Sequence, residues 1–413
     1  MLDFRPPEDN EFVINFTKLV FPLVLKFKLH GAELKVVGDG LERFKKLKGK
    51  RTVVCPNHSY RHDPEVMFGL ADMADEEFNF IAAREVFDWN NGLNGWFLQQ
   101  LGCYSVVRGA VDRESFKTTK NIIVQNKKKL VLFPEGEISR QNDVLLPLET
   151  GAVQLSYWAL DELHKTKPDE PVFIQPVALK YTYKHDITER LSWCMFKIER
   201  RLGIEEDGET SLYKRVRRAS EVVLSTLESE YNCKKLETDT LNDRMSRVKT
   251  EALRTMAEFL DVELPPKGSH LDWVRVLRNN MDDFIYGDTD DLPPYQRKIW
   301  EEKASKVRRF YRDLDRVVAF IAIYEGYLTP PTTQERLSNV VELFESEVFG
   351  EVSVKGPRLI YINIGEPIDL LTRYADYKKN KKGVIEEVTL NLSQQISGML
   401  ATIDKSREIV FVN

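Results

Sequence analysis

The 413-residue sequence has only four cysteines, Cys55, Cys103, Cys194 and Cys233, and they lie far apart along the chain. No two of them form the closely spaced pair that zinc sites use, and their number does not suggest a disulfide framework. This pattern favours a reducing compartment and argues against a structural metal site.

An excess of positive charge is also missing. The chain has 60 Lys and Arg residues against 65 Asp and Glu residues, which gives a formal net charge of −5. General nucleic-acid binding needs a basic surface, so the composition argues against it. The hydrophobic content of 42% and the charged content of 30% are ordinary for a globular protein. A chain of this length can form two lobes, or one domain with a large insertion.

Long uninterrupted apolar runs are absent as well. Three lysines and a proline interrupt residues 12–29, the most apolar early stretch, so it lacks the roughly 20 apolar residues of a membrane-spanning helix. Residues 26–51 contain nine basic and three acidic side chains. We therefore expect residues 1–30 to form a helix in the membrane interface, beside a basic cluster that meets anionic head groups. The alternative is a core helix followed by a solvated loop.

The sequence does contain short β-branched runs that end in polar residues. Residues 52–55 lead into Asn57-His58-Ser59-Tyr60-Arg61-His62-Asp63, and Pro64 follows. The run predicts a buried strand, and Pro64 suits the first turn of a helix. His58 then lies at a strand end, where a carboxylate from Asp63 could fix its tautomer and make it a proton acceptor. The alternative is that Asp63 only caps the helix.

Further strands are predicted at residues 34–37, 51–55, 78–83, 102–108, 129–133 and 172–179, and helices at 64–73, 96–101 and 115–127. One strand ends at Arg108, whose guanidinium could grip a phosphate. Another runs into Pro134-Glu135-Gly136, where Gly136 permits close backbone approach and Glu135 supplies a carboxylate. Pro176 inside the last strand predicts an edge or a bulge.

These stretches, in this order, resemble the motifs of the glycerolipid acyltransferase family typified by 1-acylglycerol-3-phosphate acyltransferase (PlsC-like). The matching segments are Asn57-His58 to Asp63, Gly102 to Arg108, Phe133-Pro134-Glu135-Gly136, Ile174-Gln175-Pro176-Val177, and the late segment Arg358 to Ile368 with Gly365-Glu366-Pro367-Ile368 at its end. The resemblance covers residues 12–190 and 352–404. It implies an α/β fold with a mixed, largely parallel sheet flanked by helices, as in glycerol-3-phosphate acyltransferases.

Residues 200–350 depart from the family pattern and carry helical patterns at 211–231, 240–260, 269–285, 295–327 and 333–348. Ser269 is expected to cap one of these helices, and Thr332 with Glu335 has capping-box spacing before another. The predicted organisation is an interface helix (1–30), an acyltransferase core (31–199), a large all-helical insertion (200–350) and the return of the core (351–413). The insertion would serve packing or dimer formation, or act as a lid or a docking site for a carrier protein.

The resemblance implies transfer of a fatty acyl chain from acyl-CoA or acyl-carrier protein to the hydroxyl of a lysophosphatidate-like acceptor, with no metal, no other cofactor and no covalent intermediate. Another lysophospholipid or glycerol 3-phosphate is an alternative acceptor. His58 and Asp63 would be catalytic, and backbone amides near Gly136 would stabilise the oxyanion.

Four residues would bind the acceptor phosphate: Arg108, Glu135, Gly136 and Arg140. Glu135 would also order its loop. Ile138 stands near the place where the family usually has arginine, which weakens the phosphate assignment and leaves the acceptor open. The expected partners are the acyl donor, the lysophospholipid and the cytoplasmic face of a membrane, where the protein would bind peripherally.

Two other interpretations remain open. In the first, Cys55 is a nucleophile that the imidazole of His58, three residues later, converts to a thiolate. In the second, the protein is a non-catalytic membrane scaffold that keeps the fold and recruits partners through the helical insertion. The presence of both His58 and Asp63 speaks against the scaffold.

Overall fold

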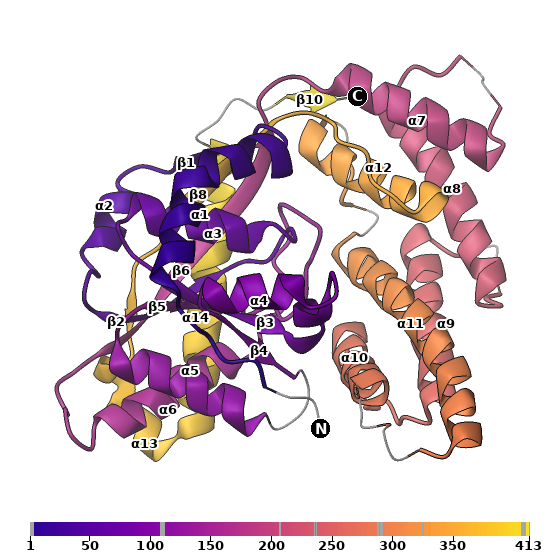
Figure 1. The fold of residues 1–413 in the computed structure, drawn as a ribbon. Coiled ribbons are helices and arrows are strands. Elements are labelled where there is room, and N and C mark those ends of the chain that lie inside the picture. The colour runs from indigo at the N-terminus through magenta and orange to yellow at the C-terminus, as the bar shows by residue number, and fades with distance from the viewer. Residues whose placement is uncertain are drawn as a thin grey trace.

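The computed structural model has an α/β core and a helical region that lie side by side (Figure 1). It describes residues 4–107, 112–205, 208–234, 236, 238–286, 289, 292–323, 326–329, 331–405 and 410–412.

The core is built on an eight-stranded sheet with the order β1-β8-β6-β2-β5-β3-β4, and β9 pairs with β6. Its strands are β1 (Glu33–Val36), β2 (Arg51–Pro56), β3 (Phe78–Ala83), β4 (Cys103–Val106), β5 (Lys129–Val131), β6 (Val172–Tyr183), β8 (Arg358–Ile364) and β9 (Ile368–Asp369). All neighbours run parallel except β6 with β8 and with β9. The predicted mixed, largely parallel sheet with flanking helices is confirmed.

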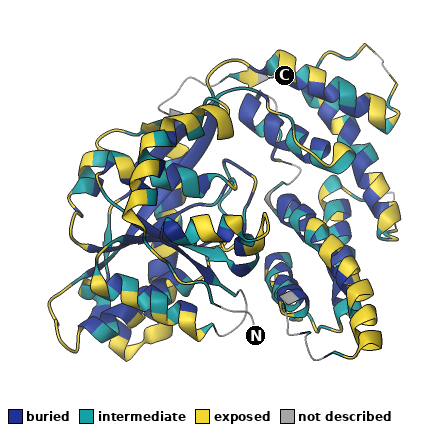
Figure 2. Cartoon of the chain, in the orientation of Figure 1, coloured by how far each residue is buried: buried dark blue, intermediate teal, exposed yellow. Residues whose placement is uncertain are grey.

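Helices cover both faces of this sheet. They are α1 (Glu11–Leu23, continued by the π-helix η1, Val24–Lys28), α2 (Gly40–Lys45), α3 (Asp63–Met73), α4 (Leu93–Gln100) after the 3-10 helix η2 (Arg84–Asp88), α5 (Arg113–Gln125), α6 (Gly151–Leu163), α13 (Tyr374–Lys379) after the 3-10 helix η3 (Leu371–Arg373), and α14 (Lys381–Lys405). Every residue of β2 is buried, as expected for a central parallel strand. Val54 packs on the side of α2 and α3, whereas Val53 and Cys55 pack on the side of α5, α6 and α14. Figure 2 shows the buried strands between helices with exposed outer sides.

The prediction that Pro176 marks an edge strand is wrong. β6 lies inside the sheet, between β2 and β8, and Pro176 is in register with Cys55 of β2. On the other side of β6, Ile174 pairs with Ile368 of β9 and Val177 pairs with Ile364 of β8. Residues 365–367 turn between these two strands, so the proline lies opposite an interruption of the ladder, where its missing N–H costs little.

The helical region comprises α7 (Thr188–Leu202), α8 (Leu212–Glu230), α9 (Leu241–Leu260), α10 (His270–Tyr286), α11 (Pro294–Ala322) and α12 (Gln334–Phe349). Two apolar clusters hold it together: one joins α7, α8 and α12, and the other joins α9, α10 and α11. The boundary predicted at residue 199 falls inside α7. The region also contains a two-residue strand, β7 (Thr332–Thr333), which pairs with β10 (Phe411–Val412).

The predicted helix caps are partly right. Ser269 caps α10, with Asp272 as the returning carboxylate. Thr240, which was not predicted as a cap, forms a capping box with Asp243 at the start of α9. At α12, however, Thr333 and not Thr332 accepts the hydrogen bond from the Arg336 amide. Both threonines are paired in β7, which runs directly into α12, so the last strand residue, Thr333, takes the N-cap position.

Candidate active site

His58 follows β2, and its Nδ1 lies 2.8 Å from Oδ2 of Asp63, the first residue of α3. The Asp63 side chain is fully buried and has two further donors: the Tyr60 amide at 2.9 Å and the Tyr181 hydroxyl at 2.5 Å. An ionised carboxylate can only accept hydrogen bonds, so we infer that His58 donates from Nδ1. This tautomer leaves a lone pair on Nε2, which is the arrangement of a general base.

The loop after β5 holds His58 from a second direction. The imidazole stacks on the Phe133 ring, with the ring centres 4.2 Å apart and the planes inclined by 25°. The His58 amide donates to Glu135 Oε1, and the His58 carbonyl accepts from the Ser139 amide at 2.9 Å. The two segments that the sequence placed at strand ends therefore meet at one edge of the sheet.

Glu135 is fully buried, and both of its carboxylate oxygens accept from backbone amides: Oε1 from His58 and Oε2 from Leu146, the latter at 2.8 Å. Burial raises the pKa of Glu135 to about 8, although the two amide hydrogen bonds act in the opposite direction. Because both oxygens are occupied inside the protein, the geometry supports the ordering role and not direct contact with an acceptor phosphate.

Gly136 is needed for the shape of this loop. Its φ is +71°, and a Cβ at this position would lie 2.7 Å from Glu149 Oε1. Its own amide donates to the Phe133 carbonyl at 3.2 Å. The expectation that amides near Gly136 stabilise an oxyanion therefore needs correction for Gly136 itself, whose N–H closes the turn. The same bond leaves no amide of Gly136 for an acceptor phosphate.

Of the two arginines predicted to bind phosphate, Arg108 lies outside the described residues. Arg140 has an exposed position on the same loop as Glu135, and its Nη2 lies 3.0 Å from Asp315 Oδ2 of α11. Arg140 can reach a phosphate only by exchanging or sharing this carboxylate partner.

Two arginines of α10 contact the same loop, although no motif in the sequence pointed to them. The Arg275 guanidinium donates from Nη2 to the carbonyls of Glu135 and Pro147, each at 3.0 Å. Arg278 is buried; its Nε donates to Glu137 at 2.7 Å and its Nη2 to Asp315 at 3.1 Å. The helical region therefore fixes the loop that holds His58.

A third set of contacts comes from α12 and β8. It reaches the loop that carries His58 and Tyr60, between β2 and α3, which is called the catalytic loop below. The Tyr60 hydroxyl donates to Asn339 Oδ1 of α12 at 2.8 Å, and the Tyr60 and Tyr181 ring centres are 4.5 Å apart. The Arg358 guanidinium lies 4.5 Å from the Tyr60 ring centre and donates to Glu342 of α12 at 2.7 Å. Nothing in the spacing of the sequence connects Tyr60 with residues almost 300 positions later.

The structure does not support Cys55 as a nucleophile. Its side chain is fully buried within β2, and burial raises the pKa of the Cys55 thiol to about 12, so the thiolate is disfavoured. Among the described residues, no group of three or more His, Cys, Asp or Glu side chains is arranged to hold a metal ion.

One face of α1 and η1 exposes a continuous apolar stripe. Its members are each more than half exposed and recur at helical spacing: Phe12, Phe16, Leu19, Leu23 and Phe27. The opposite face packs on the core through Ile14 and Phe21. In the part of the chain that the structure describes, no helix is long and apolar enough to cross a membrane.

Part of the predicted basic cluster is not available at this surface. Arg51 is buried and forms an ion pair with Glu170. Lys28 and Lys48 remain exposed, but each is paired with a carboxylate, Glu65 and Asp75 respectively. The count of nine basic residues therefore overstates the free positive charge.

A largely parallel α/β sheet with a carboxylate-oriented histidine at its carboxyl edge is typical of transferases and hydrolases that use general-base chemistry. The sequence model of the Acyltransferase family matches residues 35–180, which include His58, Asp63 and the loop around Glu135. This part of the chain belongs to the PlsC-like glycerolipid acyltransferase family, as the motifs predicted, and the protein is an acyltransferase. A comparison with curated protein sequences found no match.

Proposed function

We propose that this acyltransferase moves a fatty acyl chain from acyl-CoA or acyl-carrier protein to the hydroxyl of a lysophosphatidate-like glycerolipid. The observation that carries the proposal is the 2.8 Å contact between His58 Nδ1 and the buried Asp63 carboxylate, within the matched acyltransferase segment. A thioester donor and a lipid hydroxyl need one positioned base and no metal, which fits the side chains at this edge of the sheet.

In the proposed reaction, His58 Nε2 accepts the proton of the acceptor hydroxyl while the hydroxyl oxygen attacks the thioester carbonyl. The buried Asp63 carboxylate stabilises the imidazolium that forms. Collapse of the tetrahedral intermediate breaks the carbon–sulfur bond, and the leaving thiolate takes the proton from His58. The products are the new ester and the free thiol, so no covalent enzyme intermediate is formed.

The acceptor head group is proposed to lie near Arg140, with Arg108 as a second cation. Arg140 supports this assignment because it is exposed on the loop that carries Glu135. Its pairing with Asp315 and the presence of Ile138 favour a weaker phosphate site than two free arginines would give. Another lysophospholipid or glycerol 3-phosphate is therefore the second candidate acceptor.

We also propose that the enzyme works at the cytoplasmic surface of a membrane. The exposed stripe on α1 and η1 supports this, because five large apolar side chains in water are unfavourable unless something covers them. A helix with one buried and one exposed apolar face can lie in the interface plane, where a single-chain lipid acceptor would be presented.

Mass spectrometry of the protein mixed with acyl-CoA or acyl-carrier protein and a panel of lysolipids tests the proposal. The expected result is a diacyl product whose identity names the acceptor and donor. His58→Ala should lower turnover by about 10² to 10⁴, the usual effect of removing a general base. His62→Ala is the matched control, since among its described partners His62 contacts only Glu65 of α3, at 3.5 Å. Product formation that survives His58→Ala would contradict the mechanism, and a protein with no product from any lysolipid would favour the scaffold.

A further inference from the structure

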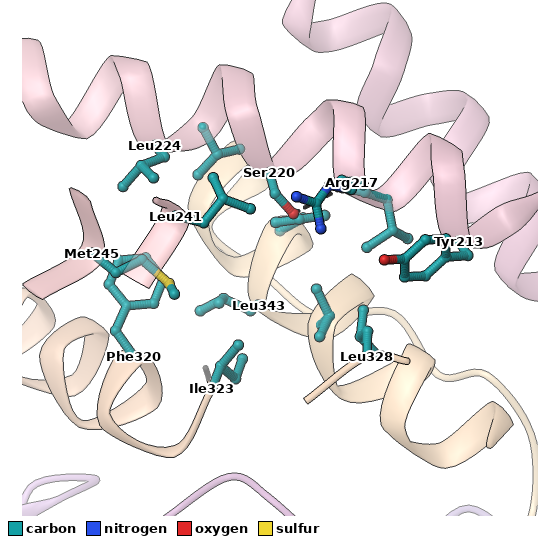
Figure 3. A pocket seen from close by; sticks show the side chains of 14 residues that line it. Tyr213, Arg217, Ser220, Leu224, Leu241, Met245, Phe320, Ile323, Leu328 and Leu343 are labelled. Atoms are coloured by element: carbon teal, nitrogen blue, oxygen red, sulfur yellow. Dashed lines mark hydrogen bonds between the residues drawn. The ribbon is translucent and has the colours of Figure 1, made fainter. Parts of the chain in front are cut away.

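The helical region encloses a cavity of about 100 Å³ between α8, α9, the end of α11 and α12 (Figure 3). Eleven of its fourteen lining side chains are apolar. Leu224, Leu343 and Phe320 are typical members, contributed by three different helices. Because apolar cavities do not hold water well, such a space favours a hydrocarbon ligand.

The remaining three lining side chains are polar and come from one helix, α8: Tyr213, Arg217 and Ser220. In Figure 3, Tyr213 and Arg217 lie on the side away from Met245 and Phe320. Arg217 is exposed, so its guanidinium marks the solvent side of the cavity. The cavity thus has an apolar interior and a cationic rim, which is the pattern complementary to an anionic amphiphile.

We propose that this cavity binds a single-chain amphiphile, with its hydrocarbon tail among the apolar side chains and its anionic head at Arg217. An apolar cavity of about 150 Å³ is known to bind benzene, so about 100 Å³ accommodates the end of a chain and not a whole lipid. The rest of the chain would run towards the rim. A fatty acid and a lysophosphatidate share this chemistry.

The cavity is distinct from the proposed catalytic site, because helix α12 lies between the two. Val340, Leu343 and Phe344 of α12 line the cavity. Asn339 and Glu342 contact Tyr60 and Arg358 behind the catalytic loop. With 3.6 residues per turn, the mean directions of these two sets differ by about 120°, so they contact different neighbours of α12. The site therefore needs no substrate bound at His58, and its occupancy can be measured whether or not the proposed reaction is correct.

Isothermal titration of the full chain with decanoate tests the proposal, with decyltrimethylammonium as a ligand of equal chain length and opposite charge. We expect decanoate to bind more tightly. Arg217→Glu should weaken decanoate binding by about tenfold or more, because a charge-assisted hydrogen bond is replaced by repulsion. Lys214→Glu is the matched control: it makes the same charge change one turn away on α8, at an exposed residue that does not line the cavity. It should leave binding almost unchanged.

Leu343→Trp, which fills the cavity, should abolish decanoate binding. If the folded variant binds as before, or if Arg217→Glu and Lys214→Glu have equal effects, the proposal is overturned. Should Leu343→Trp fail to fold, the two charge variants still decide, because both change exposed residues. A ten-carbon lysophosphatidate added in competition identifies the source of the head group: displacement of decanoate assigns the site to lysolipids as well, and its absence restricts the site to fatty acids.

Discussion

Replacing Asp63 by asparagine separates the two roles that its carboxylate has towards His58, fixing the tautomer and stabilising the imidazolium. The orientation of the new amide follows from its neighbours. The Tyr60 backbone N–H can only donate, and it contacts the same oxygen, Oδ2, as His58 Nδ1. The amide oxygen must therefore occupy this position, and the NH₂ group faces the Tyr181 hydroxyl, which is able to accept.

In this arrangement His58 still donates from Nδ1, so its Nε2 remains available as a base. Asp63→Asn should then remove only the charge opposite the imidazolium. A hydrogen bond to a charged group contributes about 1.5 to 3 kcal/mol, which corresponds to a rate loss of about 10- to 150-fold. Asp63→Ala differs, because it leaves three donors without their acceptor in a buried site, each at a cost of about 1 to 3 kcal/mol.

Release of the free thiol from acyl-CoA, in the presence of lysophosphatidate, measures the rate. Urea unfolding measures the stability of each variant. We expect Asp63→Asn to be slower than the native enzyme but faster than His58→Ala, and Asp63→Ala to be both slower and less stable than Asp63→Asn. If Asp63→Asn were as slow as His58→Ala, the amide would have turned and trapped the wrong tautomer, and the orientation derived from the Tyr60 amide would be refuted.

Three further outcomes follow from the same structure. Arg140→Ala should raise the apparent KM for the acceptor more than that for the donor, and Ile138→Arg should improve use of lysophosphatidate relative to larger head groups; equal changes for both substrates would refute the phosphate assignment. Phe16→Asp should weaken sedimentation with anionic vesicles, whereas Phe21→Leu, on the buried face of α1, should not; unchanged sedimentation of Phe16→Asp would remove α1 from the membrane face. Because the folded pKa of Glu135 is about 8 against an ordinary 4.5, the folded state keeps a proton that the unfolded chain has lost, so stability should fall as pH rises from about 4.5 to 8. Urea unfolding at pH 5 and pH 8 should show a smaller fall in Glu135→Gln.

Elements that depend on local pattern could be predicted from the sequence. The strand at residues 78–83 is observed with the same bounds, because an apolar run between polar turns is a local signal. The helix expected over residues 295–327 instead ends at Ala322. Pro176 shows why local rules fail: its tolerance depends on a turn at residues 365–367, almost 200 positions later, which interrupts the neighbouring ladder.

The contact between His58 and Asp63 could be predicted for the same reason, since the two residues are five positions apart and a strand-to-helix turn brings them together. The residues that hold this pair in place could not be predicted. Tyr181 comes from β6 and Asn339 from α12, and both contacts exist only because the chain returns to the sheet edge. Glu135 is an intermediate case. The sequence suggested two roles for its carboxylate, and only burial and two backbone donors distinguish between them.

The helical insertion presents the sharpest contrast between sequence and structure. Its helices could be predicted from their periodicity. The same helical periodicity is expected whether the insertion forms a lid, a docking site or a packing element, so it does not distinguish these roles. The contacts of α10 separate these roles, because Arg278 forms a buried pair with Glu137 beside the loop that holds His58. This pair alone does not hold α10 in place, because both charges would regain water if the helix moved away. Apolar packing adds to it: Leu146, whose amide donates to Glu135, lies in the same buried cluster as Leu277 and Met281 of α10. Moving α10 away would expose these side chains to water, which is unfavourable. The contacts therefore favour a brace on the loop that holds His58 over a lid hinged at α10.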